Sequence, residues 1–340
     1  MVATAEKFEL KLGKATRDAF GEALRELARH DQRIVVVDGD VNNSTRTEWF
    51  AAEFPDRFFN LGIAESNLVG VASGLAACGK IPVVASFACF LLCNAFDQLR
   101  MAVAFPGLNV KAVGSHAGIS IGEDGPSQMG VEDVALASAL PGFAVVVPAD
   151  EPATRAAVRA MIERQGPMYL RVGRPKVPLV YSVGESDAEL AGQRFEIGKA
   201  ITLRDGDDVT IAANGLMVAA ALQAHAALAE RGVRARVLDV HTVKPIDDAA
   251  LEAAARETGA IVVAEEHLAH GGLGSAAAMA VARRHPCRMA FVNLGDTYAE
   301  SGTPEELMEK YGLTSGAIVR AADDLLAAKG LPASGAKGRD

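Results

Sequence analysis

The segment Gly62-Ile-Ala-Glu65-Ser-Asn-Leu-Val-Gly-Val-Ala-Ser-Gly-Leu75 places one carboxylate at the start of an almost wholly apolar stretch. It predicts a helix over 64–78. Because residues 68–78 carry no charge, we expect this helix to be buried all round. A carboxylate in such a place is either paired or used in chemistry. Glu65 is therefore a candidate functional residue, and a buried structural carboxylate is the alternative that this segment leaves open.

The composition indicates a soluble α/β protein. The chain has 340 residues, half of them hydrophobic, which suggests two domains. The net charge of −9 and the scattered basic residues argue against nucleic acid or a membrane as a partner. No uncharged run reaches the length of a membrane span, and the N-terminus lacks a signal-peptide core. Four cysteines without metal-ligand spacing, apart from the pair Cys89 and Cys93, favour a cytoplasmic protein with reduced thiols.

Short β-branched runs alternate with helical patterns, which predicts βαβ units and a mainly parallel sheet. We expect an N-terminal tail over 1–14 and a first domain over 15–172. Residues 173–193 contain prolines, charges and no hydrophobic period, so we interpret them as a linker. A second αβ domain is expected over 194–328, and the tail at 329–340 is expected to be mobile.

The expected elements follow from these periods. Strands are predicted near 34–37, 82–85, 110–113, 143–147, 168–172, 209–213, 235–240, 260–264 and 289–293. Helices are predicted near 15–30, 64–78, 95–105, 131–139, 151–164, 216–231, 248–257, 272–284, 304–311 and 315–328.

In open α/β sheets, ligands bind beyond the carboxyl ends of the strands. Four polar segments are predicted there, namely 38–44, Glu65, 114–130 and 171–174. The segment at 114–130 is the richest, because it offers His116, two acids and Gln128 on a glycine-rich backbone. An ordinary surface loop is the alternative.

Long, ordered motifs resemble transketolase. In the first domain they are Gly62-Ile-Ala-Glu65-Ser-Asn, Ser86-Phe87 with Phe96-Asp97-Gln98-Leu-Arg100, and Gly114-Ser-His116-Ala-Gly-Ile-Ser-Ile-Gly-Glu-Asp124-Gly-Pro-Ser-Gln128-Met. In the second they are Arg234-Ala-Arg-Val-Leu-Asp239, Thr242-Val-Lys-Pro-Ile-Asp247, and Glu265-Glu-His with Gly271-Gly-Leu-Gly274. The likeness implies a pyrimidine-binding domain of the thiamine diphosphate fold, with helices on both faces of a parallel sheet. A transketolase C-terminal αβ domain with a mixed five-stranded sheet follows it.

The resemblance also implies half of a split enzyme. The diphosphate-binding motif of the family is Gly-Asp-Gly followed some way on by Asn, whereas Asp38-Gly-Asp40-Val-Asn-Asn43 has the inverted order and a much shorter spacing. We therefore expect no metal site at Asp38 and Asp40. The implied cofactor is thiamine diphosphate, shared with a partner. An N-terminal subunit on another polypeptide would hold its diphosphate and Mg²⁺ or Ca²⁺, and the assembly is expected to be a dimer of heterodimers.

The likeness assigns the cofactor contacts residue by residue. Glu65 corresponds to the carboxyl group that hydrogen-bonds N1′ of the aminopyrimidine ring. Phe87 and Phe90 lie where relatives place rings against the pyrimidine, with core packing as the alternative. Asp40 resembles a residue that helps to hold the cofactor region, although it could be a solvated loop acid. Cys93 falls near a position that is often aromatic in relatives.

Transketolases transfer a two-carbon ketol unit between phosphorylated sugars. The resemblance places the phosphate-side contacts at Arg17, Ser44, His116 and Arg174, and arginine suits phosphate because it binds bidentately. For Arg17, an ordinary exposed helix position is the alternative. Asp124 resembles the acid that binds a substrate hydroxyl.

Gln128 is also expected among the cofactor-binding residues, and it stands where many bacterial and fungal members carry histidine. Glutamine can donate a hydrogen bond to a developing alkoxide, but it cannot transfer a proton near neutral pH. We expect Glu65 and His116 to be the catalytic residues of this chain, and a further proton-transfer group could be a histidine of the partner subunit. We assign no role to His241 or His267.

The expected activity is reversible ketol transfer, dependent on the N-terminal subunit. Three rival functions share the two-domain plan. The β subunit of a 2-oxo acid dehydrogenase is disfavoured by the long loop at 114–130 and by the phosphate-side arginines. Deoxyxylulose phosphate synthase is normally one long chain. A non-catalytic scaffold subunit would be signalled by an altered Glu65 or a broken cofactor pocket, and the sequence shows neither. The sugars themselves cannot be identified from the sequence.

Overall fold

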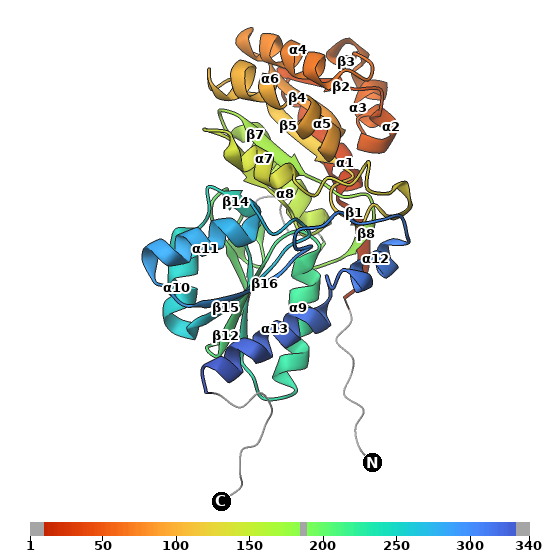
Figure 1. Cartoon of the computed structure of the whole chain (residues 1–340). Helices are drawn as coiled ribbons and strands as arrows, with labels where there is room; N and C mark the ends of the chain where they lie inside the picture. Colours follow the sequence, from red (N-terminus) through yellow and green to blue (C-terminus); the bar gives the residue numbers. More distant parts are fainter. Residues whose placement is uncertain (1–9, 184–188, 331–340) are drawn as a thin grey trace, which may run out of the picture.

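The computed structural model describes residues 10–183 and 189–330, and shows two αβ domains, one above the other in Figure 1. Most of the two predicted tails, residues 1–9 and 331–340, lies outside the described residues. Each domain has a central sheet covered by helices on both faces, which confirms the predicted fold class.

The first domain is built on a seven-stranded sheet with the order β14-β6-β7-β5-β4-β2-β3. Its strands are β2 (Ile34–Asp38), β3 (Phe58–Asn60), β4 (Ile81–Phe87), β5 (Lys111–Ser115), β6 (Ala144–Val146), β7 (Met168–Arg171) and β14 (Thr242–Lys244). All are parallel except β14, which pairs antiparallel with β6. The β-branched runs reflect a parallel sheet whose two faces are both covered.

Helices cover this sheet from both sides. On one face, α1 (Thr16–Ala28) and α8 (Glu151–Glu163) pack together and bury Phe20, Leu24 and Met161. The opposite face is covered by α4 (Glu65–Ala77), α5 (Ala88–Asn94), α6 (Phe96–Gln98), a π-helical turn (Leu99–Ala104) and α7 (Asp133–Ala139). The shorter α2 (Asn42–Thr45), α3 (Glu48–Glu53) and the 3₁₀ turns Pro55–Arg57 and Gly122–Asp124 lie in connecting segments.

The second domain has a five-stranded sheet with the order β11-β13-β12-β15-β16. Its strands are β11 (Ile201–Arg204), β12 (Val209–Ala213), β13 (Ala235–Asp239), β15 (Ala260–Ala264) and β16 (Arg288–Val292). Its helices are α9 (Met217–Ala229), α10 (Asp248–Thr258), α11 (Leu273–Arg284), α12 (Pro304–Lys310) and α13 (Ser315–Ala328). Only β11 runs antiparallel to its neighbour, so the expected mixed five-stranded sheet is confirmed.

Some expectations differ from the structure. The helix α4 is not buried all round, because Gly70 and Gly74 are exposed on a face that carries no charge. The helix expected over 95–105 is preceded in the structure by α5. The sequence did not predict α5, because its mostly apolar residues show no helical period. The segment interpreted as a linker contains β8 (Lys176–Pro178), which pairs with β1 (Leu12–Ala15), so β1 begins inside the expected N-terminal tail. Two-residue strands β9 (Glu189–Leu190) and β10 (Gln193–Arg194) pair with each other.

The strand β14 ties the two domains together. It belongs to the second domain in sequence and to the first sheet in space, where Thr242 lies opposite Val146. Lys244 Nζ donates hydrogen bonds to the carbonyls of Ser138 (2.8 Å) and Leu140 (2.6 Å) at the end of α7. The carbonyls at a helix C-terminus lack intrahelical partners, so this lysine caps α7. The relative placement of the domains is therefore fixed by hydrogen bonds as well as by packing.

Gly21 allows α1 to approach the segment after α2. A Cβ at Gly21 would lie 2.6 Å from Arg46 Cβ and 2.8 Å from Trp49 Cε3. We predict that Gly21→Ala lowers the free energy of unfolding by about 1–2 kcal/mol, since overpacking outweighs the gain in helix propensity. Gly316→Ala on α13, where the nearest atom is 3.6 Å away, should leave stability unchanged or slightly raised. Denaturant unfolding of the full chain measures both, and equal effects would contradict the close approach.

Candidate active site

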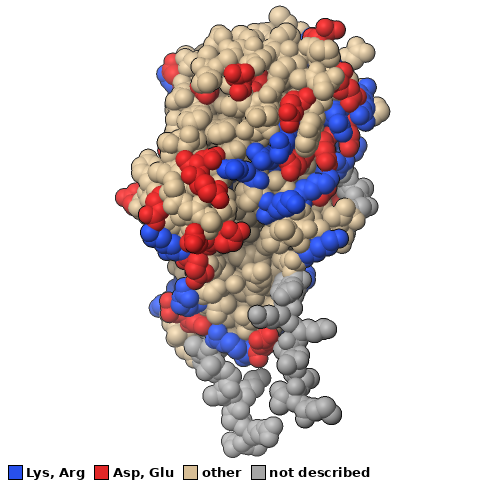
Figure 2. Space-filling view, turned by 90° about the vertical axis from the view of Figure 1, so that its right-hand side faces the viewer, with Lys and Arg blue, Asp and Glu red and all other residues tan. Residues whose placement is uncertain are grey.

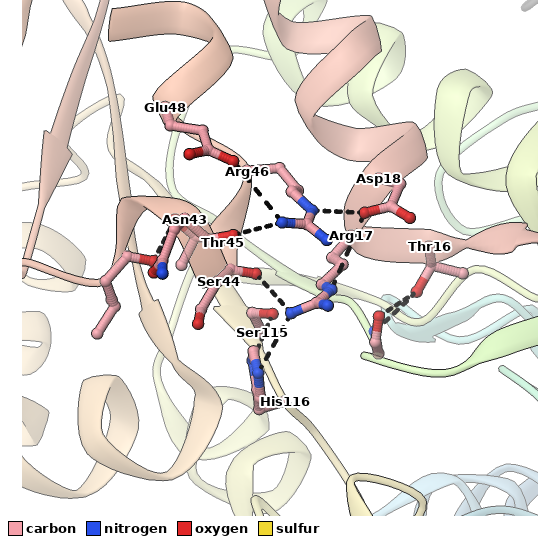
Figure 3. A network of polar contacts seen from close by, with 12 residues as sticks. Thr16, Arg17, Asp18, Asn43, Ser44, Thr45, Arg46, Glu48, Ser115 and His116 are labelled. Atoms are coloured by element: carbon pink, nitrogen blue, oxygen red, sulfur yellow. Dashed lines mark hydrogen bonds and ion pairs between the residues drawn. The ribbon is translucent and has the colours of Figure 1, made fainter.

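The predicted site residues gather at the carboxyl edge of the first sheet. The loop after β2 carries Asp40 and Ser44, β4 ends at Phe87, and His116 follows β5. Arg17, near the N-terminus of α1, reaches the same edge, and Figure 3 shows it directed toward Ser44 and His116. This is the edge where ligands of open α/β sheets bind.

Glu65 is the first residue of α4 and is only 6% exposed. Its carboxylate accepts hydrogen bonds from Ser86 Oγ and Asn94 Nδ2, both at the long distance of 3.5 Å. Among the described residues no lysine, arginine or histidine forms an ion pair with it. The helix N-terminus favours a negative charge there. Glu65 thus retains most of its capacity to bind a further polar group.

Aromatic rings stack at the same edge of the sheet. The rings of Phe87 and His116 stack with centroids 3.9 Å apart at 10°. Phe87 also stacks with Phe90, at 5.7 Å and 9°. The sequence suggested a cofactor role for both phenylalanines but gave no sign of the stack with His116, because that contact joins the ends of two different strands.

His116 is buried, and its backbone φ of 55° lies in the left-handed region that non-glycine residues rarely adopt. Its Nδ1 lies 2.9 Å from Ser115 Oγ, and its Nε2 lies 3.4 Å from Arg17 Nη1. Because arginine can only donate, Nε2 is the acceptor and Nδ1 carries the proton. Burial, aided by Arg17, Arg174 and Arg46, lowers the pKa of His116 to about 3. The ring is therefore neutral and serves as a hydrogen-bonding group.

Three arginines, Arg17, Arg46 and Arg174, are close enough to His116 to lower its pKa, and Figure 3 shows two of them, Arg17 and Arg46. Arg17 Nη1 donates to the carbonyl of Ser44 at 3.1 Å. Burial is the main cause that lowers the pKa of Arg17, followed by the nearby charge of Arg46. Sequence reasoning missed Arg46, whose left-handed backbone (φ 65°) lets Nε donate to Asp18 Oδ1 at 2.6 Å. A single arginine in a loop gave no recognisable pattern.

Two further residues that the sequence predicted as substrate contacts pair with each other: Asp124 from the loop at 114–130 and Arg174 from the segment after β7. Arg174 Nη1 donates to Asp124 Oδ1 at 3.0 Å and to the carbonyl of Ile121 at 3.3 Å. Both charged side chains are more than a third exposed, so their pair contributes little to stability. Their accessibility allows both groups to meet a ligand.

Asp38 and Asp40 both have partners within the chain. The buried Asp38 accepts hydrogen bonds from Val41 N (2.9 Å), Thr45 Oγ1 (2.9 Å) and Thr47 Oγ1 (2.7 Å), and burial raises its pKa. Asp40 is exposed and accepts from Asn60 Nδ2 at 2.8 Å. Asp38 thus shapes the loop that presents Ser44. The described residues include no cluster of three His, Cys, Asp or Glu suited to a metal ion.

An open pocket of about 500 Å³ adjoins the aromatic layer and is lined in part by Phe90, Cys93 and Asn94. Its size is in the range of small-molecule sites. Since Asn94 also contacts Glu65, the pocket and the carboxylate are neighbours. Gln128 lies between two residues that line the pocket, Ser127 and Met129. Its side-chain oxygen accepts a hydrogen bond from Ser127 Oγ at 2.6 Å.

Comparison with known proteins identifies the family. The model of the transketolase pyrimidine-binding domain matches residues 13–180, and that of the transketolase C-terminal domain matches residues 198–318. The chain belongs to the transketolase family.

Within the part of the chain that the structure describes, no helix is long and apolar enough to cross a membrane. On the face in Figure 2, basic and acidic side chains lie side by side across the middle.

Several relatives are single subunits. The chain is 42% identical to the 6-deoxy-6-sulfo-D-fructose transketolase subunit of Clostridium sp. (strain MSTE9), over 94% of this chain and 97% of that one. It is 40% identical to the putative transketolase C-terminal section of Methanocaldococcus jannaschii, over 90% and 95%. It matches human transketolase at 38% identity, over 92% of this chain but 49% of that protein.

A solved structure agrees with these relatives. A split gene transketolase, described as an inactive beta4 tetramer, shares 45% identity with a TM-score of 0.83, covering 93% of this chain and 99% of that one. The predicted likeness to the C-terminal half of a split transketolase is confirmed, and the rival enzyme families are not favoured.

The buried, arginine-flanked His116 gives a prediction on pH dependence. Since its pKa falls from the ordinary 6.5 to about 3, the unfolded state binds more protons between these values, and stability falls as the pH drops below about 6.5. The variant His116→Gln should lose part of this acid-side slope in urea unfolding measured from pH 8 to 4.5. A ring of His116 that titrates near pH 6.5 by NMR would contradict the assignment.

Proposed function

We propose that this chain is the C-terminal subunit of a thiamine-diphosphate-dependent transketolase. It transfers a two-carbon ketol unit reversibly from a ketose phosphate to an aldose or aldose phosphate, and only together with an N-terminal subunit. The observation that carries the proposal is the buried carboxylate of Glu65 near an open pocket. In the described part of the chain its hydrogen bonds, from Ser86 and Asn94, are both 3.5 Å long, and Asn94 also lines the pocket.

The residues present fit the pyrimidine end of the cofactor. A flat, partly polar ring needs an apolar slot with one well-placed polar group. Phe87, Phe90 and the pocket beside them supply the slot, and Glu65 supplies the polar group. Asp40 borders the same edge of the sheet and would support the cofactor region. The diphosphate and its Mg²⁺ or Ca²⁺ belong, in this proposal, to the N-terminal subunit.

When bound, thiamine diphosphate supplies the nucleophile and electron sink for cleavage of a carbon–carbon bond. The protein supplies orientation and electrostatics. Glu65 holds a proton at the pyrimidine ring nitrogen, where a buried carboxyl group can share it. Gln128 donates a hydrogen bond to an oxygen of the substrate that gains negative charge, and Asp124 accepts one from a substrate hydroxyl.

The arginines bind the anionic end of the sugar. Arg17, Arg174 and Arg46 lie around His116, whose neutral ring adds hydrogen-bonding capacity without competing charge. The relative from Clostridium is named for a sulfo sugar, and one from Phocaeicola vulgatus, at 38% identity, for apulose 4-phosphate. Both names describe sugars with an anionic group, which supports a sugar phosphate or a related anionic sugar as the substrate here.

The split arrangement and the assembly are part of the proposal. The uncharged outer face of α4, with Gly70 and Gly74 exposed and Ile63 80% exposed beside it, suits close packing against another subunit. The related beta4 tetramer is described as inactive. We therefore propose a dimer of heterodimers in the cytoplasm as the active form. The chain alone is expected to self-associate without turnover.

The role of Glu65 is tested by Glu65→Gln. We predict that this variant folds and assembles normally but loses ketol transfer by at least about 100-fold, because the amide cannot share a proton with the pyrimidine nitrogen. The measurement is product formation by the complex reconstituted with a transketolase N-terminal subunit, with circular dichroism as the folding control. A near-normal rate at saturating cofactor would refute the role, and full activity of the isolated chain would refute the split enzyme.

The role of the arginine cluster is tested by Arg17→Ala. Losing a charged partner of the substrate anion should raise KM by about 10- to 100-fold. Arg29→Ala changes an exposed arginine at the far end of α1 and should leave KM unchanged. Steady-state kinetics with sugar phosphates in the reconstituted complex measure both. The same KM in both variants would show that the anion binds elsewhere.

A further inference from the structure

Glu266 brings a buried carboxyl group from the second domain against the loop at 114–130. It follows β15, is 5% exposed, and its Oε1 accepts a hydrogen bond from Ser120 N at 2.6 Å. Gly118 in the same loop has φ 80°, and a Cβ there would lie 2.0 Å from the carboxyl carbon of Glu266. The loop backbone therefore folds directly against this carboxylate.

Arg171 lies on the other side of Glu266 and holds the end of the loop. Its Nη2 donates to the carbonyl of Gly130 at 2.8 Å, and its Nε donates to Asp133 Oδ2 at 2.8 Å. Its Nη1 is 4.0 Å from Glu266 Oε2. The two ends of the loop are thus anchored to a pair of buried charges, one from each domain.

Two further glycines of the loop lie close to another segment of the second domain, residues 301–304. A Cβ at Gly122 (φ 83°) would lie 2.9 Å from Pro304 Cδ, and one at Gly125 (φ 81°) would lie 2.5 Å from Ser301 Oγ. Asp124 lies between these two contacts. Just before this segment, Tyr298 lines the open pocket together with Phe90. The second domain therefore contacts the loop at three points.

We propose that Glu266 is a positioning residue, through which the second domain fixes the loop that presents Asp124 and Gln128 to the substrate. The importance of those two side chains rests on the proposed function; the contact of Glu266 with the loop does not. A buried ion pair rarely adds net stability compared with apolar packing, because both charges lose their hydration. A role in fixing the loop explains why a charge is found at this position.

The first test measures the loop in the full chain without a partner. Hydrogen exchange of the amides at 118–128 should be about tenfold faster in Glu266→Ala, because a charge-assisted hydrogen bond is lost. Glu266→Gln keeps an acceptor oxygen and should fall between Ala and wild type. Exchange in β5 should not change. The control Glu305→Gln alters an exposed acid on α12 and should match wild type.

The second test uses the reconstituted complex. Because the loop is positioned less firmly, Glu266→Ala should raise KM for the sugar phosphate about tenfold while the folded fraction stays constant. Glu266→Gln should raise KM by less than Glu266→Ala does. A fall in kcat at unchanged KM, or unchanged exchange at 118–128, would overturn the proposal. If the wild-type complex showed no ketol transfer, the proposed function would fail while the exchange result still decided the contact of Glu266 with the loop.

Discussion

The site depends on a carboxylate that is buried at the carboxyl edge of a parallel sheet without a basic partner. Removing an ionisable group from water is unfavourable unless other groups replace the lost hydration. At Glu65, the positive end of α4 and two long hydrogen bonds replace only part of it. The rest of the hydrogen-bonding capacity is open to a ligand, and the packing of α4 against β4 fixes the position of the helix that carries Glu65.

His116 connects the two halves of the site. One side of the site is aromatic and suited to a flat ring, and the other is cationic and suited to an anion. The imidazole stacks on Phe87 and also contacts Arg17, so it touches both. Burial keeps it neutral, which allows it to lie among arginines without adding to their repulsion. The separation between the proposed ring and anion subsites is therefore set by the ends of β4 and β5.

The sequence predicts most of the fold because its strands are continuous β-branched runs, such as the one that becomes β2. It predicts Glu65 as a candidate because an acid stands at the start of an uncharged, apolar helix. It could not predict β14, whose three residues pair with a strand about a hundred positions earlier. Nor could it predict the exposed face of α4, since an uncharged helix looks the same whether it is covered by its own chain or by another one. Arg46, the stack on His116 and the reach of Glu266 are contacts between distant segments, which local patterns do not encode.

The most direct measurement is a crystal or cryo-EM structure of the reconstituted complex with thiamine diphosphate bound. We predict that the Glu65 carboxylate lies within hydrogen-bonding distance, about 2.6–3.2 Å, of the pyrimidine ring nitrogen. We also predict that the diphosphate lies on the N-terminal subunit. A cofactor enclosed wholly by copies of this chain, or Glu65 turned away from the ring, would contradict the proposal.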